Sequence, residues 1–148
     1  MNRKTFIFVA LIALFCTFSH AQSTDKGYQP ILDKFFSLME KGKYADAVDY
    51  IYSTNPYMSS NPDAVTQLKS NMQGLPSLIG SYQGHEVLLS QPLSSRYTHI
   101  DALIYFDRQP LWIAFDFYKV KGKWQVNSFN FTDNFDNLRE KFNQKQKK

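Results

Sequence analysis

Cysteine and histidine are scarce in this chain of 148 residues. It holds one cysteine, Cys16, and three histidines, of which only His85 and His99 lie beyond the first 21 residues. A lone cysteine makes no intramolecular disulfide and no thiolate metal site, and two histidines cannot form a three-histidine metal centre. We therefore expect no metal site and no cofactor, and a fold stabilised by packing alone.

Glycine is also sparse. The six glycines are scattered and form no glycine-rich phosphate-binding loop. No serine stands in the glycine-flanked turn that exposes the nucleophile of serine hydrolases. The common signatures of nucleotide binding and of Ser-His-Asp hydrolysis are thus absent from the sequence.

The most apolar segment is too short to span a bilayer. Phe6–Phe18 covers 13 residues, whereas a membrane-spanning helix needs roughly twenty. Arg3 and Lys4 precede this segment, and Ser19-His20-Ala21 follows it with small residues at the two positions that a leader peptidase reads. This pattern predicts a cleavable signal peptide over residues 1–21.

The mature chain, residues 22–148, is accordingly predicted to be exported, either to the periplasm or out of the cell, with no stable membrane anchor after cleavage. Lipid attachment at Cys16 is an alternative, although the bulky Phe15 before it fits poorly the small residue that lipoprotein processing requires. The mature length suits one domain with one core.

Aromatic residues are abundant: the chain has 13 Phe, 9 Tyr and 2 Trp, which can supply a large hydrophobic core. The formal net charge of +4 falls by two when Arg3 and Lys4 leave with the signal peptide. Much of the remaining excess lies in four lysines near the C-terminus, which we interpret as a solvated helix end and not as a nucleic-acid-binding tail. They are Lys141, Lys145, Lys147 and Lys148.

Helical periodicity dominates the first half of the mature chain. Apolar residues predict a helix from Tyr28 that ends at Gly42, where glycine supplies a left-handed stop. A second short helix starts at Tyr44 and ends before Pro56. A third begins at Asn61-Pro62, a capping side chain followed by proline, and extends to Ile79.

After Ile79 the apolar periodicity changes to two. A terminal helix from about Asn134 then carries Phe135, Leu138 and Phe142 on its inner face. Helices followed by antiparallel strands predict an α+β fold, with N-terminal helices packed on a four-stranded antiparallel sheet and a C-terminal helix. The strands are expected near residues 82–91, 96–106, 111–120 and 124–132.

Turn lengths predict how the last three strands pair. A four-residue turn over residues 107–110 sets Phe106 opposite Leu111. At Lys121-Gly122-Lys123 we prefer a three-residue loop, because it sets Phe115 opposite Phe129, whereas a two-residue loop would set Phe115 opposite Ser128.

This pairing gives the sheet two different faces. One is apolar, and we expect the helices to cover it: Ile100, Ala102, Ile104, Phe106, Leu111, Ile113, Phe115, Phe117, Phe129 and Phe131. The other is rich in aromatic residues with charges near its middle, which suits a partner or a second packing layer. It carries Tyr97, His99, Asp101, Leu103, Tyr105, Trp112, Ala114, Asp116, Tyr118, Val120, Trp124, Val126 and Ser128.

The order of elements, the segment from Gly42 to Ile51 (Gly-x-Tyr-x-x-Ala-x-x-Tyr-Ile) and the hairpin from Phe115 to Phe131 (with Gly-x-Trp-x-Val at its turn) resemble the nuclear transport factor 2-like superfamily, also called ketosteroid-isomerase-like. The resemblance is architectural and covers nearly the whole mature chain. It implies a sheet curved around the helices into a cone with a pocket at its wide end, and dimers formed through the outer sheet face. Because the superfamily includes isomerases, cyclases, dehydratases and non-catalytic domains, the fold does not choose among them.

Asp101 lies across from Asp116 in the predicted pairing, and His99 lies beside Tyr118. Two carboxylates about 5 Å apart cannot both ionise cheaply. One of them is therefore a candidate general acid or base, with His99 and Tyr118 as its catalytic partners. In the alternative interpretation, which we prefer, the acids form an exposed or dimer-facing row that Arg96 or Arg108 neutralises.

We therefore expect a non-enzymatic exported domain that binds a small apolar ligand or a protein partner, a second copy of the chain included. The candidate ligand-binding residues are Tyr97, Tyr105, Trp112 and Trp124. The alternative is a small lyase or isomerase of the ketosteroid-isomerase kind, with Asp101 or Asp116 as its base. A carboxylate inside an open pocket would favour the enzyme, and a filled interior would favour the binding domain.

Overall fold

The computed structural model describes residues 26–58 and 62–145. Three helices, a four-stranded antiparallel sheet and a C-terminal helix follow one another along the chain. The α+β fold class predicted from the sequence is thereby confirmed. The predicted signal peptide, the side chain of Phe142 and the last two lysines lie outside the described residues.

Helices α1 (Gln29–Glu40), α2 (Tyr44–Ser53) and α3 (Pro62–Ile79) form the first half. The turn after α1 depends on Gly42, whose φ of +70° lies in the left-handed region. The N–H of Lys43 donates to the carbonyl of Leu38 at 2.9 Å, and the N–H of Gly42 donates to that of Met39 at 3.0 Å. These two bonds satisfy carbonyls at the end of α1 and reverse the chain into α2.

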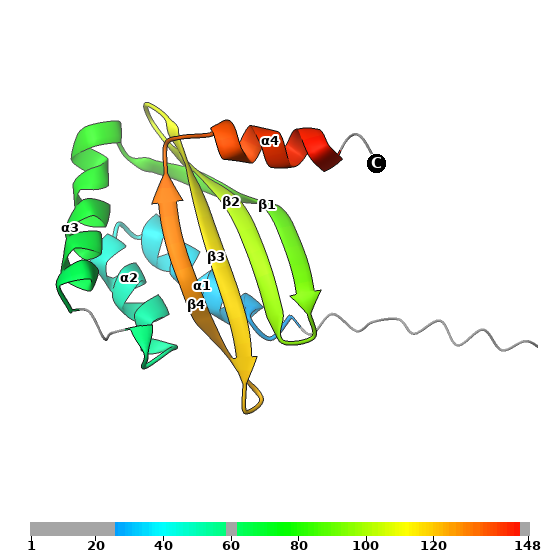
Figure 1. The fold of residues 1–148 in the computed structure, drawn as a ribbon. Helices are drawn as coiled ribbons and strands as arrows, with labels where there is room; N and C mark the ends of the chain where they lie inside the picture. Colours follow the sequence, from blue (N-terminus) through cyan, green and yellow to red (C-terminus); the bar gives the residue numbers. More distant parts are fainter. Residues whose placement is uncertain (1–25, 59–61, 146–148) are drawn as a thin grey trace, which may run out of the picture.

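The sheet contains β1 (Tyr82–Ser94), β2 (Tyr97–Phe106), β3 (Pro110–Val120) and β4 (Lys123–Thr132), in that spatial order. Figure 1 shows a curved sheet with α1, α2 and α3 on one side of it. We call the sheet face that these helices cover the inner face, and the opposite one the outer face.

Aromatic side chains fill the space between the helices and the inner face. Phe35 of α1 is fully buried and packs edge to face on Phe115 of β3 at 5.1 Å between ring centroids. Phe117, also fully buried, stacks on Tyr28 at 5.1 Å. The apolar face predicted from the sequence is confirmed, since all ten of its residues belong to this core or pack against it.

The pairing of β2 with β3 differs from the prediction by two residues. Ile104, and not Phe106, lies opposite Leu111, and Ile100 lies opposite Phe115. Because side chains alternate along a strand, a shift of two residues changes the partners but keeps every side chain on its face. The apolar pattern alone therefore could not distinguish the two registers.

The β3–β4 hairpin also differs from the prediction. Its loop has two residues, Lys121 and Gly122, both with positive φ, and Val120 pairs with Lys123. The predicted pair of Phe115 and Phe129 is nevertheless present, because the register shifts by one residue at Asn127. This extra residue is a β-bulge.

The bulge moves two residues to the other face. Val126 pairs with Phe117 and is fully buried in the core, and Trp124 packs on Tyr28 at 5.4 Å between ring centroids. The prediction that Trp124 and Val126 lie on the outer face is therefore wrong, because it carried the alternation of residues 128–132 through the bulge without a break.

Helix α4 (Asp136–Lys145) lies apart from the other three helices (Figure 1). Its Leu138 is buried beside Leu103, which β2 presents on the outer face. We expected the helices to cover the inner face, and α4 is the exception. That face is already filled by α1 to α3, so the apolar side of α4 packs on the aromatic outer face instead.

Candidate functional site

Strands β2 and β3 bring a histidine and two aspartates together on the outer face. His99 lies directly opposite Asp116, and Asp101 lies opposite Ala114. The predicted pairs, Asp101 with Asp116 and His99 with Tyr118, are therefore not formed, for the register reason given above. Tyr118 instead faces Tyr97 across the strands.

The imidazole of His99 bridges the two carboxylates. Its Nδ1 lies 2.7 Å from Oδ1 of Asp116, and its Nε2 lies 3.1 Å from Oδ1 of Asp101. The indole Nε1 of Trp112 donates a third hydrogen bond, also to Oδ1 of Asp101, at 2.8 Å. We call these four residues, His99, Asp101, Trp112 and Asp116, the outer-face cluster.

The burial of Asp101 makes this arrangement necessary. Its side chain is 0% exposed, and a buried carboxylate is tolerated only when it is paired and hydrogen-bonded. His99 and Trp112 supply those contacts. Since both imidazole nitrogens face carboxylate oxygens, the doubly protonated imidazolium is the form that can donate to both. The side chain between the acids is thus His99, and not Arg96 or Arg108 as we expected.

The cluster can hold a proton but has no free acceptor on its imidazole. His99 and Asp116 have side chains that are 20% and 26% exposed, so water reaches both. A general base needs an unoccupied acceptor within hydrogen-bond reach of its substrate, and each nitrogen of His99 already contacts an aspartate. The contacts of His99 with Asp101 and Asp116 thus link β2 to β3.

The aromatic candidates separate into three environments. Tyr97 lies beside the cluster, where burial first and the Asp116 carboxylate second raise its pKa. Tyr105 donates a hydrogen bond to Glu86 of β1 at 2.9 Å, and that bond is the main cause of its raised pKa. Trp112 belongs to the cluster itself, whereas Trp124 packs on the inner side of the sheet, away from the other three.

A hollow between α4 and the outer face was not predicted from the sequence. It measures about 500 Å³, within the range of roughly 300 to 1,000 Å³ that small-molecule sites occupy. Five of its lining residues are apolar, and the sixth is a cation at the rim. We call it the α4 groove; it is lined by Leu88, Leu103, Pro110, Phe135, Leu138 and Arg139.

One signal in the sequence pointed to this groove. Leu103 is an aliphatic residue in the middle of an otherwise aromatic and charged face, and Phe135 and Leu138 are spaced to share one side of a helix. Matching these two apolar features to each other, and not both to the inner core, would have located the groove.

Comparisons of the chain with known protein families, with curated proteins and with solved structures give no match. Across residues 26–58 and 62–145, no helix combines the length and the apolar character needed to cross a membrane. Within the same residues, no group of three or more His, Cys, Asp and Glu side chains is arranged to hold a metal ion.

Proposed function

We propose that the mature chain is an exported, non-enzymatic domain that binds a small apolar molecule in the α4 groove. The observation that carries this proposal is the composition of the groove wall, in which five apolar residues from the sheet, from α4 and from the segment before it line an open hollow of about 500 Å³. Ligand sites of this size are typically apolar with few polar groups.

The packing at the centre of the inner face supports a site outside the core. The hollow that lies between α3 and the inner face, beside Leu75, Leu111 and Phe131, is smaller than the α4 groove, at about 310 Å³. The resemblance to nuclear transport factor 2-like domains, which stays a proposal, would place a pocket between the helices and the sheet. The side chains of Phe35 and Phe117 have 0% of their surface accessible, and that of Phe115 has 1%. These three rings therefore border no open space between the helices and the sheet. An apolar ligand is better accommodated on the outer face, under α4.

The outer-face cluster supports a domain without chemistry of its own. The two candidate bases, Asp101 and Asp116, both contact His99, and Asp101 is buried. Neither of them lines any of the hollows described here. A protein partner on the same face, a second copy included, is the other occupant that its aromatic residues would suit, with Tyr97 and Tyr118 as contacts.

The rim of the groove favours some ligands over others. Arg139 is the one charged residue among the described lining residues, and it is paired with Asp136 at 3.3 Å in a strongly exposed position. Such a pair contributes little binding energy. We therefore expect affinity to follow apolar surface and not ligand charge.

The test is a fluorescence titration of the purified protein with N-phenyl-1-naphthylamine, a neutral dye that brightens in apolar sites. We expect saturable binding. Leu103→Ser should weaken it by about tenfold or more, because burying a leucine side chain contributes roughly 1.5–3 kcal/mol. Leu93→Ser is the matched control, since Leu93 is 60% exposed and does not line the groove.

Trp112 offers a second readout, because it pairs with Leu103 across β2 and β3. Its emission should shift as the groove fills. The proposal fails if the dye does not bind, or if Leu103→Ser and Leu93→Ser bind it equally well while both remain folded by circular dichroism.

A further inference from the structure

The end of the sheet opposite α4 is strongly basic. Two turns meet there, the one between β1 and β2 and the one between β3 and β4. The flanking segments, residues 87–100 and 117–132, contain no aspartate or glutamate. They contribute four cations: Arg96, Lys119, Lys121 and Lys123.

A backbone hydrogen bond fastens the two turns together. The N–H of Lys119 donates to the carbonyl of Arg96 at 2.8 Å. The backbone positions of Arg96 and Lys119 are therefore fixed relative to each other by this hydrogen bond. Between the turns lies a hollow of about 360 Å³, the basic hollow, lined by Ser95, Arg96, Lys119, Lys121 and Gly122.

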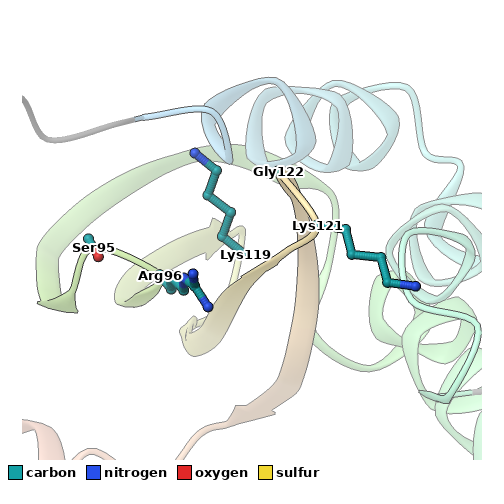
Figure 2. Close-up of a pocket in the computed structure, with 5 residues that line it drawn as sticks. All are labelled: Ser95, Arg96, Lys119, Lys121 and Gly122. Atoms are coloured by element: carbon teal, nitrogen blue, oxygen red, sulfur yellow. The ribbon is translucent and has the colours of Figure 1, made fainter.

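Figure 2 shows how the cations lie around this hollow. Arg96 and Lys119 extend to one side of the β3–β4 hairpin, and Lys121 extends to the other. The ammonium Nζ of Lys119 also lies over the ring of Trp124, 6.0 Å from its centroid, a distance at which a cation–π attraction helps to orient the side chain. Arg96 and Lys119 both line the hollow, and Lys121 adds to the local positive potential.

The wall at Gly122 leaves room for a ligand. Its φ is +80°, and a Cβ built there would meet no atom within 4 Å. The hydroxyl of Ser95 is a further donor beside Arg96. The nearest acid along β3, Asp116, is already bound to His99 at 2.7 Å and faces the outer-face cluster, so it does not neutralise the hollow.

This donor set matches a tetrahedral oxyanion. A guanidinium presents a fork of N–H groups that binds phosphate oxygens in pairs, and an ammonium adds a point charge. The space corresponds to about a dozen water molecules at roughly 30 Å³ each, which exceeds a bare phosphate. A phosphate with an organic group attached would fit.

We propose that the basic hollow binds the phosphate group of an anionic ligand, with Arg96 and Lys119 as the binding residues. The phosphate belongs either to a soluble phosphorylated compound or to a lipid headgroup. This site is separate from the α4 groove, and each proposal can fail while the other stands.

The experiment has two arms, both at constant ionic strength set with chloride. In the first, inorganic phosphate is titrated into the purified protein while backbone amide signals are followed by NMR. In the second, vesicles of phosphatidylglycerol and of phosphatidylcholine are tested for sedimentation of the protein.

We expect phosphate to shift the amide signals of residues 95–96 and 119–122 in a saturable way, or phosphatidylglycerol vesicles to retain the protein where phosphatidylcholine vesicles do not. The first result identifies a soluble ligand and the second a lipid headgroup. In whichever arm shows binding, Arg96→Gln should weaken it about tenfold, as expected for hydrogen bonds to a charged group. Lys119→Gln is the second variant.

The matched control is Arg108→Gln, which removes the same charge at the opposite end of β2, where Arg108 donates to the carbonyl of Leu78. Equal weakening by Arg96→Gln and Arg108→Gln would mean that only the overall charge attracts the anion, and would overturn the proposal. Absence of binding in both arms would overturn it as well.

Discussion

The two faces of the sheet bury their side chains by different means. The inner face packs phenylalanines against α1, with Phe115 and Phe117 nearly or fully inaccessible. The outer face buries a carboxylate, Asp101, and compensates it with an imidazole and an indole N–H. The apolar contacts of the inner face are non-directional, whereas a buried charge is stable only while each hydrogen-bonding partner is present.

The two histidines of the described residues express the same contrast. On the inner side of β1, His85 stacks on Phe36 at 3.7 Å between ring centroids. Burial there lowers the pKa of His85, against the opposing influence of Glu40 and Asp33. On the outer face, the two ring nitrogens of His99 lie 2.7 and 3.1 Å from aspartate oxygens. One face thus stacks its histidine on a phenylalanine ring, and the other holds its histidine between two acids.

The largest expected effect comes from opening the inner face. Phe117→Ala should lower the free energy of unfolding by about 3–5 kcal/mol, the usual cost of truncating a buried phenylalanine, measured by urea denaturation. Tyr57→Ala is the control, because Tyr57 is 82% exposed, and its loss should stay within about 0.5 kcal/mol. Similar losses for both variants would mean that the inner face is not the core.

A smaller loss should follow from uncharging the outer face. Asp101→Asn removes the charged acceptor for His99 and should cost about 1.5–3 kcal/mol, the range for hydrogen bonds to charged groups. Asp116→Asn provides the matched comparison and should cost less, because its side chain is 26% exposed and water can replace the lost contact. A more stable Asp101→Asn protein would indicate that the two acids repel each other and that His99 does not bridge them.

The smallest effect should appear in the pH dependence of stability. A lowered pKa for His85 means that its contribution is present above its ordinary pKa of about 6.5 and is lost as the pH falls below it. His85→Gln should therefore reduce the loss of stability in acid. His99→Gln, which removes the imidazole between Asp101 and Asp116, is the comparison variant on the outer face.

Urea midpoints of the parent and both variants at pH 5 and pH 8 measure this pH dependence. Ring-carbon NMR shifts of His85, followed over the same range, assign it to that residue. If His85→Gln loses as much stability in acid as the parent, burial of His85 does not control the pH dependence.

The candidate site was partly predictable. The sequence placed His99, Asp101 and Asp116 on one face and near the middle of the sheet, and the structure agrees. It did not predict which of them face each other, because registers that differ by two residues leave the alternation of faces unchanged. In the observed register, Asp101 and Asp116 do not face each other, and the imidazole of His99 lies between them.

The β3–β4 hairpin shows a second kind of limit. We rejected a two-residue loop because it appeared to set Phe115 opposite Ser128. The structure has that loop together with the pair of Phe115 and Phe129, and the bulge at Asn127 reconciles the two. A bulge has no strong local signature, since it forms where packing on both sides of it favours different registers. Trp124 was therefore assigned to the wrong face.

By itself the sequence determined the helices, the strands and the inner-face residues other than Val126 and Trp124, because each depends on the spacing of apolar residues over a few turns or a few pleats. Only the tertiary structure decided the strand registers, the partner of His99 and the side of the sheet that α4 covers. Those features depend on contacts between segments that are distant in the sequence. Because α1 to α3 cover the inner face, the outer face is the surface on which Leu138 of α4 is buried.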